Sequence, residues 1–327
     1  MGKRRRCLLT LALPFLCFIL CFLSVPVSHV YATEGGGTNA PLGAEDFMTG
    51  AAPPAGTQVF INYFQYYHAG TLNGNDGGKA AIPGLGNVKF NLDVAVEVLR
   101  YVDVTKWHIL GGDFLWHFVL PIVYTHVNAA AGPVDLFTGT STDLANIETG
   151  IGIHWHCKDI NNVFAVDVVA PTGYYDMTDP SSIGRAYWSL DPLDAFTYLG
   201  GKNAPLPGFE VSTKVMYWLN STNTQTHYRS GQEFAFDYAV GQHFGPWVVG
   251  ATGFGHYQTT NDESFGKTAV DPFTGLPTGY MAKEFAVGPG VSVDIPHGCL
   301  TFKYFHDVMA QNVPVGDHFW LKWIFAW

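Results

Sequence analysis

The sequence predicts an all-β fold, a transmembrane up-and-down antiparallel β-barrel of about 12 strands (roughly 10 to 14). Three observations predict it. The chain begins with a basic and then apolar export signal, continues with long segments in which apolar and polar residues alternate, and ends in an aromatic-rich strand that stops at Trp327. Each of these features is typical of proteins that are exported to the bacterial outer membrane.

The first 32 residues predict an N-terminal signal-peptide helix. Four basic residues at 3–6 precede an apolar run over 7–27, and Ala32 provides a small residue for cleavage before Thr33. The apolar run is long enough to span a bilayer, so an uncleaved anchor is the alternative. We interpret residues 33–56 as a flexible N-terminal segment and residues 57–327 as the barrel.

The composition of the mature chain excludes several classes of protein. Cleavage removes four of the 17 basic residues, so 13 basic and 27 acidic residues leave a formal charge of −14, which argues against nucleic acid as a partner. The full sequence has 37 glycines and 19 prolines, nearly all of them after residue 32, and they argue against long helices. Only Cys157 and Cys299 remain, too few for a disulfide scaffold.

The alternation is clearest over Asn87–Asp103. Apolar residues at 88, 90, 92, 94, 96 and 98 alternate with mostly polar residues at 89, 91, 93 and 97. A tilted strand needs about 9 to 11 residues to cross a bilayer, whereas strands of soluble sandwiches usually have about 5 to 6. We therefore expect the apolar face to contact lipid and the polar face to line the lumen. Similar alternation recurs at 147–156, 209–220 and 284–295.

Twelve segments follow this pattern, and the connections between them alternate between short and long, as between periplasmic turns and outer loops. We place the strands at 57–68, 87–103, 108–127, 146–157, 162–171, 186–198, 208–220, 231–244, 247–259, 282–295, 299–309 and 317–327.

The last predicted strand has a specific signature. Phe319, Leu321, Trp323, Phe325 and Trp327 alternate with other residues, and the chain stops on the last of them. Outer-membrane barrels end this way, and the barrel-assembly machinery recognises that end, so we expect this machinery as a partner. The alternative is a final amphipathic strand of a soluble domain.

A family resemblance covers about half of the mature chain. It is carried by residues 171–176, 183–192, 196–199, 209–212, 228–238 and 288–290, together with Lys303 and Tyr304. These stretches resemble a family of bacterial proteins assigned to the meta-pathway of phenol degradation. The resemblance implies a transporter-like outer-membrane barrel and a link to the uptake of aromatic or other hydrophobic compounds.

If the alternation is interpreted correctly, a largely acidic set of side chains lines the lumen. An open acidic pore would attract cations, whereas charges that pair across neighbouring strands would plug a narrow barrel, and both alternatives stay open. The lumen-lining candidates are Lys89, Asp93, Glu97, Glu148, His154, His156, Asp167, Glu210, Lys214, Glu233, Asp237, Glu284, Asp294 and Lys303.

The sequence offers little support for metal binding or catalysis. His154 and His156 lie two residues apart on one strand face, but two ligands do not make a metal site. Ser212, Ser292 and His243 are not joined by any catalytic motif, and no Gly-x-Ser-x-Gly elbow occurs. We therefore predict a protein that is not an enzyme and has no catalytic residues, metal or other cofactor, with a barrel hydrolase as the rival class.

The loop over residues 172–188 is the outer segment that we single out for function. Its Pro-Thr-Gly start fixes a turn, and an arginine stands beside two aromatic residues. The loop is either a constriction that contacts ligand at the outer mouth or a structural latch that closes the barrel top. The candidates are Tyr174, Asp176, Arg185, Tyr187 and Trp188.

These features together predict an outer-membrane channel or transporter, embedded in outer-membrane lipid, for passive uptake of small aromatic or hydrophobic compounds. The alternatives are a structural or adhesive outer-membrane barrel with a plugged lumen and, less favoured, a barrel hydrolase.

Overall fold

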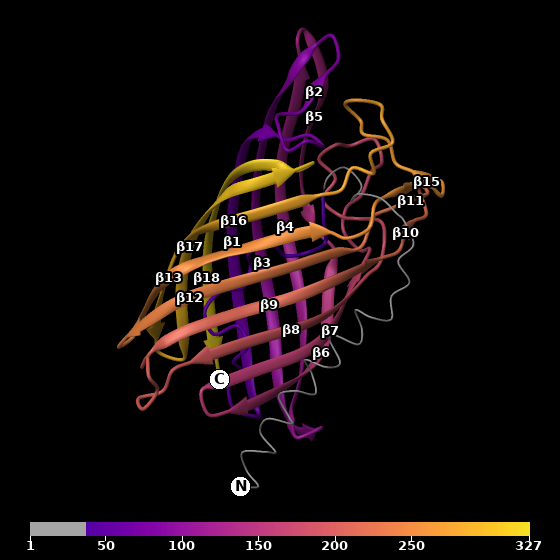
Figure 1. Cartoon of the computed structure of the whole chain (residues 1–327). Helices are drawn as coiled ribbons and strands as arrows, with labels where there is room; N and C mark the ends of the chain where they lie inside the picture. The colour runs from indigo at the N-terminus through magenta and orange to yellow at the C-terminus, as the bar shows by residue number, and fades with distance from the viewer. Residues whose placement is uncertain (1–36) are drawn as a thin grey trace.

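Twelve long antiparallel strands form one closed barrel in the computed structural model, which describes residues 37–327 (Figure 1). The all-β barrel class is therefore confirmed, and most boundaries lie within a few residues of their predicted positions. The strands are β1 (Thr57–Leu72), β3 (Gly86–Ile109), β4 (Gly112–Ala131), β6 (Ile147–Cys157), β7 (Ile160–Ala170), β8 (Ser189–Leu199), β9 (Phe209–Asn220), β12 (Glu233–Phe244), β13 (Trp247–Gln258), β16 (Lys283–Ile295), β17 (Gly298–Gln311) and β18 (Pro314–Ala326).

The barrel closes because its first and last strands pair. β1 lies antiparallel to β18, with Val59 opposite Ala326 and Tyr67 opposite His318. On its other side β1 pairs with β3, and the remaining strands pair with their neighbours around the barrel. Closure gives the backbone groups of the terminal strands partners, which a strand in lipid requires.

The two ends of the barrel differ in the length of their connections. Tight turns join β3 to β4 and β6 to β7, and Leu110, Gly111 and Lys158 adopt positive φ angles of 53°, 80° and 55° there. Such angles match the turns that connect twisted hairpins. We call this the periplasmic end and the opposite, long-loop end the outer end, as in other outer-membrane barrels.

The outer end carries additional short strands. β5 (Val134–Leu144) pairs with β4, and β2 (Ala81–Ile82) pairs with β3, so this side of the barrel extends beyond the rest (Figure 1). The loops nearby hold a small four-stranded sheet. Its strands are β10 (Thr222–Asn223), β11 (Tyr228–Arg229), β14 (Glu263–Ser264) and β15 (Lys267–Thr268).

The predicted signal peptide, residues 1–32, lies outside the described residues. Over residues 37–327, there is no helix that is long and apolar enough to cross a membrane.

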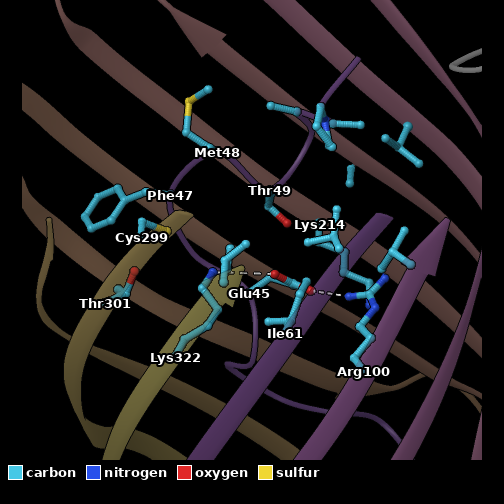
Figure 2. Close-up of a pocket in the computed structure, with 18 of the residues that line it drawn as sticks. Glu45, Phe47, Met48, Thr49, Ile61, Arg100, Lys214, Cys299, Thr301 and Lys322 are labelled. Carbon is cyan, nitrogen blue, oxygen red and sulfur yellow. Dashed lines mark hydrogen bonds and ion pairs between the residues drawn. The ribbon is translucent and has the colours of Figure 1, made fainter. Parts of the chain in front are cut away.

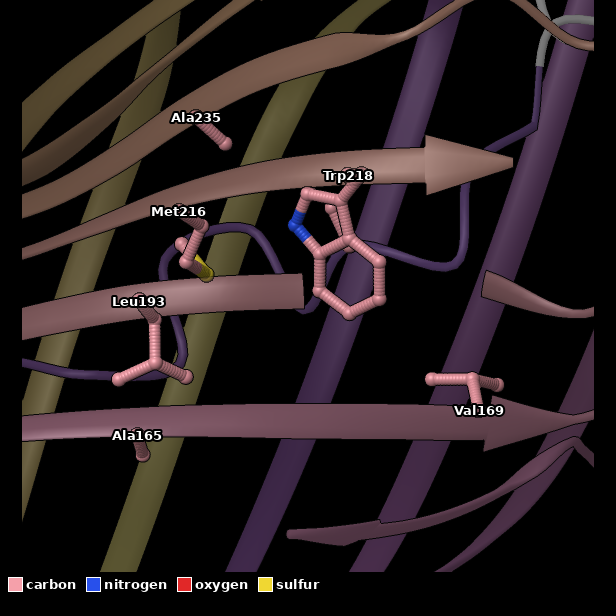
Figure 3. Packing of buried hydrophobic residues seen from close by; sticks show 7 residues of the cluster. Ala165, Val169, Leu193, Met216, Trp218 and Ala235 are labelled. Atoms are coloured by element: carbon pink, nitrogen blue, oxygen red, sulfur yellow. The ribbon is translucent and has the colours of Figure 1, made fainter. Parts of the chain in front are cut away.

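Residues 37–56, which we call the inner segment, lie within the barrel. Ala40 belongs to a cluster of buried side chains from β7, β8, β9 and β12, and Leu42 packs against it. Figure 3 shows Trp218 and Met216 at the centre of this cluster, with Leu193 and Val169 beside them. We expected a flexible segment over residues 33–56 and no place in the lumen for it; in the structure, residues 38–50 form hydrogen bonds with the barrel wall.

Candidate functional site

The inner segment runs along the lumen from the outer end to the periplasmic end. Its start contacts Glu233, where β12 begins at the outer end, and its later part contacts Glu210, near the periplasmic start of β9. The hydrogen bonds that hold it are Thr38 Oγ1 to Glu233 Oε2 (2.5 Å), Gly43 N to Asp237 Oδ1 (2.8 Å), Glu45 N to Asp237 Oδ2 (2.9 Å), Met48 N to Glu210 Oε1 (2.5 Å) and Gly50 N to Thr197 Oγ1 (2.9 Å).

Two lysines of the barrel wall form ion pairs with Asp46 of the inner segment. Lys303 Nζ lies 2.9 Å from Asp46 Oδ2, and Lys322 Nζ lies 2.5 Å from Asp46 Oδ1. Lys303 also donates to the carbonyl oxygens of Ala44 (2.8 Å) and Glu45 (3.1 Å), and its side chain is fully buried. A buried ammonium requires such partners, because removing it from water without them costs several kcal/mol.

The neighbouring residue, Glu45, joins the inner segment to the adjacent strands of the same part of the wall. Its carboxylate lies 2.7 Å from Arg100 Nη1 and 3.8 Å from Lys322 Nζ (Figure 2). Tyr63 Oη donates to Glu45 Oε1 (3.0 Å), and Arg100 in turn donates to Tyr63 Oη (3.3 Å). Glu45 is therefore held by groups from β1, β3 and β18 together.

This cross-link stands between two cavities of about 400 Å³ each. The outer cavity is lined by residues 37–42 and the upper parts of β1, β3 and β4, and the periplasmic cavity by residues 47–53 and their lower parts. Glu45, Arg100 and Lys214 line both. The Glu45–Arg100 ion pair therefore marks the boundary between the two halves of the lumen.

Aliphatic side chains dominate the side of both cavities that β1, β3 and β4 form, with Arg100 and His117 among them. Val94, Val96 and Val98 of β3 face the outer cavity, and Val102 and Val104 of the same strand face the periplasmic cavity. We call this surface the aliphatic wall. Its members from the three strands are Val59 and Ile61 of β1, Leu92, Val94, Val96, Val98, Val102 and Val104 of β3, and Leu115, Val119, Pro121 and Val123 of β4.

The predicted orientation of β3 was therefore wrong. We expected Lys89, Asp93 and Glu97 in the lumen. They alternate along β3 with the residues of the aliphatic wall, so they lie on the outside of the barrel, which we call its outer face. There Asp93 Oδ1 accepts a hydrogen bond from Tyr66 Oη (2.8 Å), and Glu97 accepts one from Asn62. Period-two alternation shows that a strand has two different faces but does not show which face meets lipid.

One residue of β3 favours the observed orientation. Arg100 lies on the same face of β3 as the valines, and an arginine facing the middle of a bilayer costs about 2–4 kcal/mol. We assigned Arg100 no role from the sequence, and the charges on the other face of the strand weigh against this orientation.

The structure places most of the other lumen candidates on the inner face. Three of the acidic candidates each have a histidine partner. The distance from the histidine Nε2 to the carboxylate oxygen is 2.8 Å for His117 and Asp167, 2.6 Å for His243 and Glu210, and 2.8 Å for His256 and Glu233. His156 is exposed at the periplasmic end, where it shares Asn161 Oδ1 with His154. The inward-facing candidates are Glu148, His154, Asp167, Glu210, Lys214, Glu233, Asp237, Glu284, Asp294 and Lys303.

The inner face also holds functional groups that the sequence analysis missed. His117 and His256 are almost fully buried there, and Asp307 and His318 form a further pair with an Nε2–Oδ1 distance of 3.0 Å. Alternation along β4, β13, β17 and β18 would have placed all four inward, but without a known partner none stands out from the other polar residues.

The outer loop over residues 172–188 is tied to the barrel and to itself. Gly184 N donates to the carbonyl oxygen of Tyr174 (2.6 Å), and Asn146 Nδ2 donates to that of Arg185 (2.9 Å). Tyr187 is 1% exposed, whereas the adjacent Trp188 is 55% exposed. The Arg185 guanidinium lies against Gly37. A side chain at residue 37 would clash with it, because a Cβ atom added to Gly37 would lie 1.5 Å from Arg185 Nη2. The loop therefore reaches the start of the inner segment.

Two further candidates in this loop stabilise its turn. Asp176 Oδ1 accepts hydrogen bonds from Thr178 N (2.8 Å) and Thr178 Oγ1 (2.7 Å), and these bonds lower the pKa of Asp176. Tyr174 Oη donates to Asp179 Oδ2 (3.3 Å). Both contacts are local, as expected for residues that order a turn.

Comparisons with known proteins give the following findings. A family model described as "Putative MetA-pathway of phenol degradation" matches residues 69–323. A search of curated protein sequences finds no significant match. Among solved structures, the COG4313 outer membrane channel from Pseudomonas putida F1 aligns with a TM-score of 0.66 at 15% identity, covering 84% of this chain and 97% of that one. The translocator domain of the autotransporter NalP from Neisseria meningitidis aligns with a TM-score of 0.41 at 11% identity, covering 84% and 89%.

Proposed function

Because the chain belongs to the MetA-pathway of phenol degradation family, and its fold is that of an outer-membrane barrel, we propose that it is a passive channel for small aromatic or other hydrophobic compounds. The observation that carries the proposal is the aliphatic wall. It offers an apolar surface in both cavities, which Arg100 and His117 interrupt near the boundary between them. Water-filled pores are usually polar inside, so valines in this position favour solutes that leave water readily.

The size of the two cavities fits small solutes. Each volume of about 400 Å³ falls in the range of roughly 300–1,000 Å³ that is typical of ligand pockets. A solute would contact the aliphatic wall on one side and the inner segment on the other. A passing solute must cross the Glu45–Arg100 boundary, and charged groups such as Asp167 and Glu284 line the cavities on either side of it. The channel would therefore be narrow and selective.

The inner segment also supports the alternative of a structural barrel with a plugged lumen. Its many hydrogen bonds and the buried Asp46 pairs hold it firmly in place. The two functions differ in a simple way. A channel lets a solute enter vesicles without moving the rest of the barrel, whereas a plugged barrel does not.

Entry of solutes into vesicles tests the proposal. Vesicles should carry lipopolysaccharide in the outer leaflet, because phenol crosses ordinary phospholipid without a protein. We expect vesicles containing the protein to take up phenol faster than protein-free vesicles, and faster than they take up arabinose. Equal entry of both solutes would indicate a general pore. Entry at the protein-free rate would indicate the plugged barrel.

A further inference from the structure

Three buried side chains on neighbouring strands meet on the wall of the outer cavity. They are Glu284 of β16, Asp307 of β17 and His318 of β18, with exposures of 7%, 3% and 5%. One possible ligand atom from each lies within 4.8 Å of the other two. We propose that these three residues bind a divalent transition-metal ion such as zinc.

The donor set suits such an ion. Imidazole nitrogen and carboxylate oxygen together are typical zinc ligands, with bonds of about 2.0–2.2 Å, so ligand atoms must come within about 4 Å of each other. His318 Nε2 lies 3.0 Å from Asp307 Oδ1. Three protein ligands would leave a coordination position open for water or a solute.

The charge of the cluster also favours a cation. A carboxylate oxygen of Glu284 lies within 4.8 Å of one of Asp307, and two buried carboxylates so close together repel each other unless a proton or a cation lies between them. Among the described residues, neither forms an ion pair with a lysine or arginine. Asp46, in contrast, is paired with both Lys303 and Lys322.

The surroundings hold the ligands in a suitable orientation. Asp307 Oδ2 accepts hydrogen bonds from Gly316 N (2.9 Å) and Tyr67 Oη (3.3 Å), so Oδ1 is the oxygen that faces His318. The Tyr67 ring stacks on the His318 imidazole at 4.1 Å, and Phe254 meets it edge-on at 5.4 Å. These contacts fix the imidazole plane and keep one side of the site dry.

A second layer of contacts is present as well. Gln65 Nε2 lies 3.3 Å from His318 Nδ1. Metal at His318 Nε2 requires the proton on Nδ1, and the Gln65 amide accepts that proton once its oxygen and nitrogen exchange places. Gln65 is therefore a positioning residue for His318.

Metal can reach the site from the lumen, because Gln65, Tyr67, Glu284 and His318 all line the outer cavity. The site also lies beside the seam where the barrel closes, since His318 lies opposite Tyr67 in the pairing of β18 with β1. A bound ion would cross-link three strands next to this seam. We therefore expect metal to stabilise the folded barrel.

A second cluster of similar composition serves as an internal comparison. His117, Glu148 and Asp167 also bring their ligand atoms within 4.8 Å of one another. The positive charges of Lys214 and Arg100 act on both Glu148 and Asp167, whereas no lysine or arginine within residues 37–327 acts on Glu284 in this way. The proposal therefore assigns the metal to the Glu284 cluster and not to this one.

Zinc binding to the purified mature barrel in detergent tests the proposal, after treatment with a chelator. We expect one Zn²⁺ per chain by calorimetry and a higher unfolding temperature in its presence. Glu284→Gln should weaken binding at least about tenfold, and so should Asp307→Asn. Asp317→Asn is the matched control, because Asp317 binds Tyr304 and His306 on the outer face of β18, and it should bind zinc as the wild type does.

Further readouts keep the test decisive. Heat-dependent migration on gels shows whether each variant folds. If Glu284→Gln does not fold, Asp307→Asn and Gln65→Leu replace it in the test. Gln65→Leu should weaken zinc binding about tenfold. Failure of the wild type to bind zinc would overturn the proposal. So would unchanged binding by the ligand variants, loss of binding in Asp167→Asn, or a Co²⁺–thiolate absorption, which would point to Cys299.

Discussion

The carboxylate of Glu45 lies 2.7 Å from the guanidinium of Arg100, at the place where the two cavities of the lumen meet. Glu45 belongs to the inner segment and Arg100 to the aliphatic side of the barrel, so this ion pair connects the segment to the wall along which a solute would pass. The pair therefore lies where a solute moving from one cavity to the other would have to pass.

Replacing one partner of this pair should destabilise the barrel more than replacing both. Glu45→Gln leaves Arg100 without its carboxylate, and Arg100→Gln leaves Glu45 with Lys322 at 3.8 Å. A double-mutant cycle should give a coupling free energy of about 0.5–3 kcal/mol. Chemical unfolding in lipid vesicles measures it. Strictly additive effects would show that the two groups do not interact in the folded protein.

Asp46→Asn should have a large effect on stability, because it leaves the buried Lys303 and Lys322 without their shared carboxylate. Breaking a buried ion pair by removing one partner costs about 3–5 kcal/mol. Asp135→Asn, at an exposed position of β5, is the control and should change stability by about 0.5 kcal/mol or less. Equal unfolding free energies for the two variants would contradict the buried position of Asp46.

Removing residues 38–50 should open the lumen. The deletion takes away the hydrogen bonds to Glu233, Asp237 and Glu210 and merges the two cavities. Single-channel recordings should then show a higher conductance than the full-length protein. A conductance equal to that of the full-length protein would mean that the segment does not occupy the lumen in the membrane.

Glu97 and Asn62 should contribute little to conduction, because they bind each other on the outer face. Replacing both with leucine removes a polar pair from that face, so stability in lipid should stay the same or rise. Ion selectivity should not change. Arg100→Gln, on the lumenal face of the same strand, provides the comparison and should alter selectivity. A selectivity change in the leucine variant would indicate that Glu97 faces the lumen, as we expected from the sequence.

The sequence was sufficient to predict the strands and their number, because alternation and turn residues are local properties of the chain. The orientation of β3 was not predictable in the same way. Both of its faces contain charge, with Arg100 among the valines and Glu97 on the other side, so hydropathy alone supports either orientation.

The place of the inner segment depends on contacts that are distant in the sequence. Asp237 lies 194 residues from Gly43, and Ala44 lies 259 residues from Lys303. The segment itself has no period-two or helical pattern that would indicate its partners. The Glu284, Asp307 and His318 cluster has the same origin, because the pairing of β16, β17 and β18 brings together residues that show no recognisable motif.

Phenol uptake by vesicles that contain Val96→Ser combined with Val98→Ser tests the central claim most directly. Both side chains face the outer cavity, so the hydroxyls make the aliphatic wall polar there, while Ala95→Ser places a hydroxyl on the outer face as the control. We predict a severalfold slower entry of phenol for the double variant and no change for Ala95→Ser. Unchanged phenol entry through a correctly folded double variant would contradict the account.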